Sequence, residues 1–147
     1  MKTSGKQGFG VLALVLAGAS CGGEADVTVL DARVRFDAQV VSQVDRVSIY
    51  VLGPKMADGK FLPCSLLRLR TVDPTSADVD LLASRTDINL GSSSGTATLG
   101  DIPSGDGRLV YVEAYGGTNV IGNGCEEQVK VESGKTRSVT INVYLFP

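Results

Sequence analysis

The sequence predicts an all-β domain, an antiparallel β-sandwich of about seven to nine short strands. Apolar and polar residues alternate along several segments, which is the period of a strand with one buried face. Turn signals separate these segments at intervals of about ten residues, a spacing typical of sandwiches. Eighteen glycines supply conformations that tight turns and bulges need. Beyond residue 23 no segment has a convincing helical period.

The first strand is predicted in residues 32–40, where apolar residues alternate with Arg33 and Arg35. We expect these two arginines to share one polar, solvent-facing side. A second strand follows in residues 47–51, and Gly53-Pro54 is expected to end it. Residues 56–63 read as a loop around Asp58-Gly59.

The middle of the chain has a weaker pattern. Residues 66–70 fit either a strand or a helical turn, and residues 72–84 carry three acids and one proline but little periodicity. Ile88 and Leu90 are expected in a short strand. The Gly/Ser-rich stretch 91–95 is predicted to be a flexible turn.

The C-terminal part is predicted to contain three further strands and two turns. Residues 96–99 and 109–115 are predicted strands, the second with valines on one face and Tyr111 and Tyr115 on the other. Asn123-Gly124 is a hairpin signal. Residues 133–135 are a turn before the last alternating strand, residues 139–145.

The N-terminal residues have the three parts of an export signal in order. Lys2 and Lys6 provide positive charge, residues 8–19 are uncharged and mostly apolar, and the small residues Ala19 and Ser20 precede a cleavage point. The apolar run is short for a membrane span, which takes about 20 residues. We therefore predict a signal peptide in residues 1–20, a tether in residues 21–26 and one domain in residues 27–147.

Ala19-Ser20-Cys21 resembles the lipobox of bacterial lipoproteins, in which small residues precede a cysteine that is acylated and becomes the new N-terminus. The resemblance implies a membrane anchor on Cys21. Gly22 in place of an aspartate favours the outer membrane by the same resemblance. Ordinary secretion stays open, because Gly18 stands where the family usually has an aliphatic residue.

If Cys21 carries lipid, Cys64 and Cys125 are the two cysteines that remain. Two thiols outside the cytosol are expected to form a disulfide. Such a bridge closes a long loop and stabilises the fold by about 4 kcal/mol in the chain-entropy model. Two free buried thiols are the alternative.

Three segments together carry a second resemblance: residues 99–105, residues 109–114, and residues 134–136 with 139–141. They look like the transthyretin-like sandwich, most of all its carboxypeptidase regulatory-like modules, in which similar turns precede a core strand and the last strand. The resemblance covers about a third of the chain. Because such modules are mostly non-catalytic, no functional residues are implied.

Composition excludes several chemistries. The chain has no histidine, so Ser-His-Asp and Cys-His catalysis and histidine metal sites are absent. Cleavage before Cys21 takes 14 basic residues to 12 against 16 acidic ones, and this net charge of −4 does not suit a nucleic-acid partner. We expect no cofactor. A calcium loop of Asp73, Asp78 and Asp80 is a weaker alternative, without the EF-hand spacing.

These observations predict a lipid-anchored envelope module that binds a partner or serves a structural role and is not an enzyme. Its partners would be the membrane, through the anchor, and an envelope protein or carbohydrate. The alternative is a small carbohydrate- or calcium-binding protein that uses residues 56–63 or 73–84. A sugar- or protein-binding patch of Tyr111 and Tyr115 is a separate alternative, although packing across strands is the favoured interpretation of these rings.

Overall fold

The computed structural model describes residues 28–37, 41–89 and 94–147. The predicted signal peptide, the tether and Cys21 lie outside these residues. The described elements are β1 (Val29–Phe36), a 3-10 turn η1 (Val41–Gln43), β2 (Arg46–Met56), α1 (Cys64–Arg68), β3 (Val79–Asn89), β4 (Ser94–Leu99), β5 (Gly105–Gly116), β6 (Asn119–Val131) and β7 (Thr136–Leu145). No helix among the described residues is both long and apolar enough to span a membrane.

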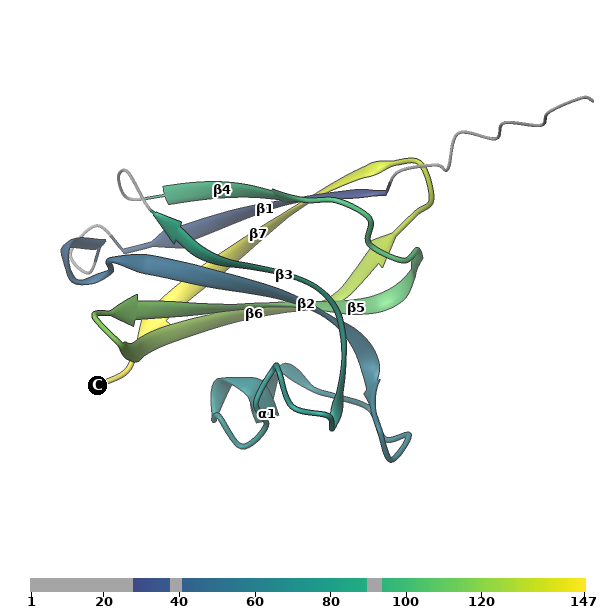
Figure 1. Cartoon of the computed structure of the whole chain (residues 1–147), viewed down its shortest axis with the longest axis horizontal. Coiled ribbons are helices and arrows are strands. Elements are labelled where there is room, and N and C mark those ends of the chain that lie inside the picture. The colour runs from purple at the N-terminus through teal and green to yellow at the C-terminus, as the bar shows by residue number, and fades with distance from the viewer. Residues whose placement is uncertain (1–27, 38–40, 90–93) are drawn as a thin grey trace, which may run out of the picture.

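The predicted all-β class is confirmed. The strands form one hydrogen-bonded sheet in the order β3-β2-β5-β6-β7-β1-β4, and this sheet is curled (Figure 1). The curl brings its two edge strands near each other, and Arg85 Nη1 of β3 donates a hydrogen bond to the Thr98 carbonyl of β4 at 3.2 Å.

One pairing differs from the antiparallel prediction. β1 and β7 run parallel, with Val34 opposite Ile141, whereas the other pairs are antiparallel. Parallel neighbours need a long connection, and here nearly the whole described chain lies between them. Because the alternation within each strand is the same for either direction, the sequence pattern carried no information about this pairing.

The sheet has a narrow join between β6 and β7. Only two residue pairs connect these strands, Gly122 with Leu145 and Asn123 with Tyr144. A Cβ built on Gly122 would lie 2.6 Å from the Tyr144 carbonyl oxygen, and one on Gly124 would lie 2.4 Å from that of Asn142. The two glycines therefore allow the two backbones to approach. On either side of this join lie the β3-β2-β5-β6 half and the β7-β1-β4 half.

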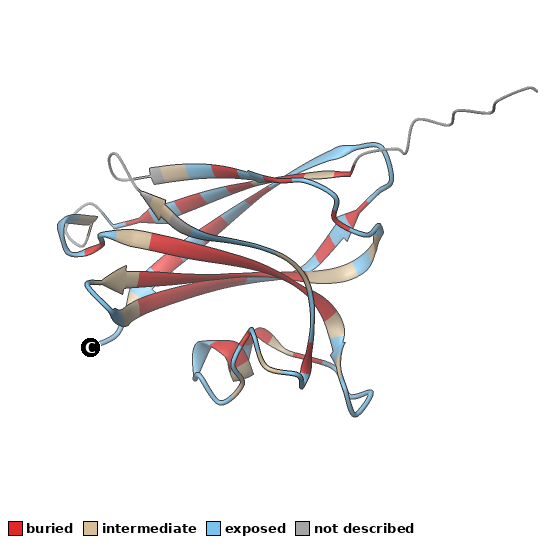
Figure 2. Ribbon diagram, in the orientation of Figure 1, coloured by how far each residue is buried: buried red, intermediate tan, exposed pale blue. Residues whose placement is uncertain are grey.

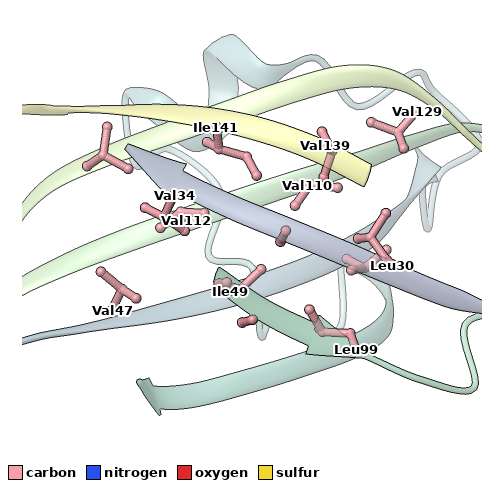
Figure 3. Packing of buried hydrophobic residues seen from close by; sticks show 14 of the residues in the cluster. Leu30, Val34, Val47, Ile49, Leu99, Val110, Val112, Val129, Val139 and Ile141 are labelled. Atoms are coloured by element: carbon pink, nitrogen blue, oxygen red, sulfur yellow. The ribbon is translucent and has the colours of Figure 1, made fainter. Parts of the chain in front are cut away.

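The main core lies between these two halves. Leu30 and Val34 of β1 and Ile141 of β7 share one cluster with Val110 and Val112 of β5 (Figure 3). Figure 2 shows buried and exposed positions alternating along β1 and β4, whereas the middle of β5 is buried without interruption. The β7-β1-β4 half thus has one solvent-exposed face, whereas the middle of β5 in the other half is covered on both faces.

The cover on the second face is α1 and its flanking loop. Leu62 and Leu67 are fully buried there against Leu109 and Tyr111 of β5 and Cys125 of β6. The α1 segment lies on the side of β5 and β6 away from β1 and β4 (Figure 1). A segment that reads from sequence as either strand or helix is therefore a single helical turn with two buried residues, Cys64 and Leu67.

Two predicted boundaries are wrong. Gly53-Pro54 does not end the second strand, because β2 continues to Met56. The proline falls where the pairing with β3 is irregular, between Leu52 and Met56, and a residue without an N–H is tolerated at such a place. Asn123-Gly124 is not a hairpin turn but lies within β6. The β5–β6 turn is Gly117-Thr118, where Gly117 has φ +61°.

The weakly patterned middle of the chain contains a longer strand than predicted. β3 covers Val79–Asn89 and stands at one end of the sheet. Edge strands are less covered than central ones, so their apolar alternation is weaker. The loop at Asp58-Gly59 and the turn before β7 are confirmed, with positive φ at Gly59 and Gly134.

Candidate functional site

Two groups of polar residues stand out on the fold. The first is the tyrosine–glutamate cluster beneath α1, formed by Tyr50, Tyr111, Glu113, Tyr115 and Asn123. The second is the solvent-exposed side of β4, β1 and β7, here called the β1–β7 polar face. Its residues are Asp31, Arg33, Arg35, Asp37, Thr96, Thr98, Ser138, Thr140, Asn142 and Tyr144.

Glu113 is at the centre of the tyrosine–glutamate cluster. Although its side chain is a polar carboxyl group, only 7% of the residue is exposed. The Tyr115 hydroxyl donates to Glu113 Oε2 at 2.7 Å, and the Tyr50 hydroxyl approaches the same oxygen at 3.4 Å. The Tyr111 hydroxyl lies 3.5 Å from Glu113 Oε1. The tyrosine hydroxyls thus supply hydrogen-bond partners to a buried polar group, which would otherwise be costly to desolvate.

The cluster is also joined to the α1 segment. Asn123 Nδ2 donates to the Arg68 carbonyl at 2.9 Å and to the Tyr111 hydroxyl at 3.2 Å. Tyr111, which is fully buried, lies 3.2 Å from the Leu67 carbonyl oxygen through its hydroxyl. Its ring stacks on that of Tyr50, with centroids 6.2 Å apart. The expectation of packing across strands is therefore confirmed for Tyr111, which forms no exposed patch.

The space beside this cluster is small. A hollow of about 60 Å³ is lined by Arg70, Val72, Asp73, Pro74 and Glu113. A water needs about 10–15 Å³ of such space, so the hollow has room for a few waters. The hydrogen bonds of Tyr111 and Asn123 to the carbonyl groups of Leu67 and Arg68 hold α1 on the sheet.

We predict that alkaline pH destabilises the protein through these tyrosines. Burial raises the pKa of Tyr50, Tyr111 and Tyr115, and Glu113 raises it further for each. A raised pKa means that the folded state holds the proton more tightly than the unfolded state. The contribution to stability is therefore complete below the ordinary pKa of about 10 and declines as pH rises above it.

The measurement is a pH series in which tyrosinate absorbance and circular dichroism are followed on the same samples. Ionisation of these three rings should coincide with loss of folded signal above about pH 10. The double variant Tyr111→Phe, Tyr115→Phe should show a smaller decline in stability over that range. Complete ionisation of all tyrosines in a chain that stays folded would contradict the prediction.

The β1–β7 polar face has rows of side chains set by strand register. Arg33 of β1 lies between Thr96 of β4 and Thr140 of β7. Asp31 occupies the preceding row beside Thr98, whose hydroxyl donates to Asp31 Oδ1 at 2.8 Å. Because strand neighbours lie about 4.8 Å apart, each row is a continuous polar strip across three strands.

Two hollows open on this face. One, of about 170 Å³, is lined by Asp31, Arg33, Thr96, Ser138, Val139 and Thr140. The other, of about 260 Å³, is lined by Arg35, Phe36, Asp37, Asn142, Val143 and Tyr144. They follow one another along β1 and β7, and Tyr144 is 66% exposed beside the larger one.

The acids considered for a calcium loop are not gathered into a metal site. Asp73 instead accepts hydrogen bonds from the backbone N–H and the hydroxyl of Thr75, both at 2.7 Å. Asp78 ends the loop before β3, and Asp80 lies within β3 next to Gly53 of β2. Among the described residues no group of three or more Asp, Glu, Cys or His side chains is placed to hold a metal ion.

The predicted disulfide is confirmed. Cys64 and Cys125 are bonded, with Cα atoms 5.8 Å apart, and the bridge ties the first residue of α1 to β6. Two more contacts reinforce it: Arg68 Nη2 donates to the Cys125 carbonyl at 2.8 Å, and the Cys64 backbone N–H donates to Glu127 Oε1. Cys21 lies outside the described residues.

Sequence reasoning placed Arg33 and Arg35 on a polar side correctly, but it did not identify Glu113, Asn123 or Tyr144. A glutamate between two tyrosines at alternate positions was a usable signal, because all three side chains point to one face of a strand. Nothing local indicated that α1 would cover that face.

Comparison of the chain with known protein families, with curated proteins and with solved structures gives no match.

Proposed function

We propose that this protein is an envelope lipoprotein whose domain is a non-catalytic binding module, held by acyl chains on Cys21 at the outer membrane. The observation that carries the proposal is the Cys64–Cys125 disulfide. Disulfides persist in oxidising compartments, and this pairing leaves Cys21 as the remaining one of three cysteines. The small residues before Cys21 and the two glycines after it suit an acylated, tethered N-terminus.

The anchor would act by simple partitioning. Each buried methylene contributes about 0.8 kcal/mol, so one acyl chain binds reversibly while two or more hold a protein stably on a bilayer. A lipoprotein cysteine carries two or three chains. The domain could then remain at the surface without a spanning helix.

The accessibility of the polar groups supports binding over catalysis. The buried Glu113 is surrounded by tyrosines and adjoins a hollow of about 60 Å³. The larger hollows lie on the exposed β1–β7 polar face. An open face with shallow hollows favours contact with a partner, whereas the chemistry of an enzyme usually needs a concave site that surrounds its substrate.

We further propose that the curled sheet works as a transthyretin-like sandwich of its two halves. The narrow β6–β7 join and the main core between the halves support this. So do the turns that carried the resemblance, because residues 102–104 lead into β5 and residues 133–135 lead into β7.

The anchor is tested by Cys21→Ser in the full-length chain. We expect the unchanged protein in the membrane fraction, with an intact mass that includes acyl chains, and the variant in the soluble envelope fraction. Reductant is the control, because it opens the Cys64–Cys125 bridge and should not release the unchanged protein from membranes. An exported Cys21→Ser variant that remains membrane-bound would refute the anchor. Cross-linking in intact envelopes then identifies the partner.

A further inference from the structure

Tyr144 lies on the β1–β7 polar face in a position that packing does not explain. It is 66% exposed, whereas its β7 neighbours Ile141 and Val143 on the opposite face are at most 3% exposed. The ring borders the larger hollow together with Arg35, Asp37 and Asn142. A large exposed ring beside polar side chains that line the same hollow is characteristic of a recognition site rather than of a core.

We propose that the β1–β7 polar face binds a neutral carbohydrate chain, with the Tyr144 ring as the surface on which one sugar stacks. This inference rests on the proposed binding function and names its ligand class. Sugar rings have flat C–H faces that pack against an aromatic ring, and edges of hydroxyl groups that both donate and accept hydrogen bonds. Tyrosine offers such contact area at low cost in side-chain entropy, since it has two side-chain torsions.

The polar side chains complement those hydroxyl edges. Arg35 supplies up to five N–H donors in a fixed plane, and Asn142 supplies both donors and an acceptor. Asp37 adds carboxylate oxygens at the same hollow. Arg33 and Thr140 provide the same combination at the smaller hollow.

The face is long enough for a chain rather than a single sugar. From Asp31 to Asp37 is six residues of nearly extended backbone, which is about 20 Å at 3.3 Å per residue. Along this length the two hollows follow one another on the same side of β1 and β7. A ligand lying parallel to β1 would contact both hollows, so affinity should increase with the number of sugars.

Charge indicates that the chain is neutral. Along β1 and the residue that follows it, the outward residues are Asp31, Arg33, Arg35 and Asp37, so two acids flank two bases. A polyanion would meet a carboxylate at each end of the face.

The test uses the full-length protein in detergent micelles and calorimetric titration with neutral oligosaccharides of two to six sugars. The probes are the cello-, malto- and chito-oligosaccharide series, and oligogalacturonate is the acidic comparison. We expect binding to at least one neutral series, tighter for six sugars than for two, and weaker binding to oligogalacturonate. Failure of every neutral series, or tighter binding to oligogalacturonate, would overturn the inference.

Variants localise the site. Tyr144→Ala should weaken binding about tenfold, and Tyr144→Phe should bind nearly as well as the unchanged chain because it keeps the ring. Phe61→Ala is the matched control, since Phe61 is an aromatic side chain that is 48% exposed in the loop between β2 and α1. Equal thermal stability of all three variants shows that they are folded. Unchanged binding by Tyr144→Ala, or an equal loss in Phe61→Ala, would refute the site.

The anchor and the carbohydrate site fail separately. If Cys21→Ser releases the domain from membranes but no neutral sugar binds, the inference falls and an anchored module with another partner remains. If sugars bind through Tyr144 but Cys21 carries no lipid, the site stands and the anchor falls.

Discussion

Replacing both Cys64 and Cys125 by alanine is expected to lower the free energy of unfolding by about 4 kcal/mol. The bridge joins residues 61 apart in sequence. Without it the unfolded chain regains the conformational freedom that the closed loop removes, and long loops regain the most. Small domains have total free energies of unfolding of about 5–15 kcal/mol, so the bridge contributes a large share of the stability.

The structure indicates that the loss of the bridge should destabilise the α1 segment first. The bridge, the Arg68–Cys125 hydrogen bond and the Asn123–Arg68 hydrogen bond hold the α1 segment over the tyrosine–glutamate cluster. Without the covalent link, α1 is fixed by side-chain contacts alone. Amide exchange should therefore increase most at Cys64–Arg68 and less in the middle of β5.

Urea unfolding followed by circular dichroism measures this effect. The unchanged protein under reductant, in which the same bridge is opened without a substitution, should be destabilised to a similar extent. Equal unfolding midpoints for the double variant and the unchanged protein would show that the bridge does not stabilise the fold.

Gly124→Ala is expected to destabilise the fold by about 1–3 kcal/mol, the usual cost of overpacking. The added Cβ would lie 2.4 Å from the Asn142 carbonyl oxygen and 2.8 Å from Ile141 Cγ2. One of these atoms belongs to the backbone and the other to a buried core side chain, so moving either of them costs free energy. Because only two residue pairs join β6 to β7, a shift of β7 would weaken the pairing that connects the two halves of the sheet.

Gly100→Ala is the matched control. A Cβ on Gly100 meets no atom within 4 Å, so this variant should be neutral or slightly stabilising through a less flexible unfolded chain. Thermal unfolding of the two variants and the unchanged protein gives the comparison. A Gly124→Ala variant as stable as Gly100→Ala would contradict the close approach of β6 and β7.

A shift of β7 also has a functional consequence. Asn142 and Tyr144 lie on this strand and line the larger hollow. If Gly124→Ala folds with β7 displaced, carbohydrate binding should weaken although no residue of the polar face has been changed.

Elements with one buried and one exposed face could be predicted from sequence. In β1 the apolar residues Leu30, Ala32, Val34 and Phe36 are buried and alternate with polar ones, because a period of two assigns each residue to a face whatever its neighbours are. The last strand could be predicted for the same reason. Gly59 and Gly134 mark turns, since a positive φ favours glycine.

Features that depend on distant segments could not be predicted. Asn123-Gly124 has the composition of a turn, but the glycine is needed for the approach of β7. Glycine is typical both of a tight turn and of a close approach between two strands, so its presence alone does not distinguish the two. β3 lacks a clear pattern because an edge strand is only partly covered, so its start at Val79 was not visible.

The sequence by itself determined the all-β class, the polar side of β1, several turns and a pair of cysteines able to form a bridge. Only the tertiary structure decided that β1 and β7 run parallel, that α1 covers Tyr111 and Glu113, and that Tyr144 stays exposed. The physical reason is that alternation along a strand separates its two faces but does not say what covers each one. That depends on segments far away in the chain, whose position is fixed by packing and, for α1, by the Cys64–Cys125 bond.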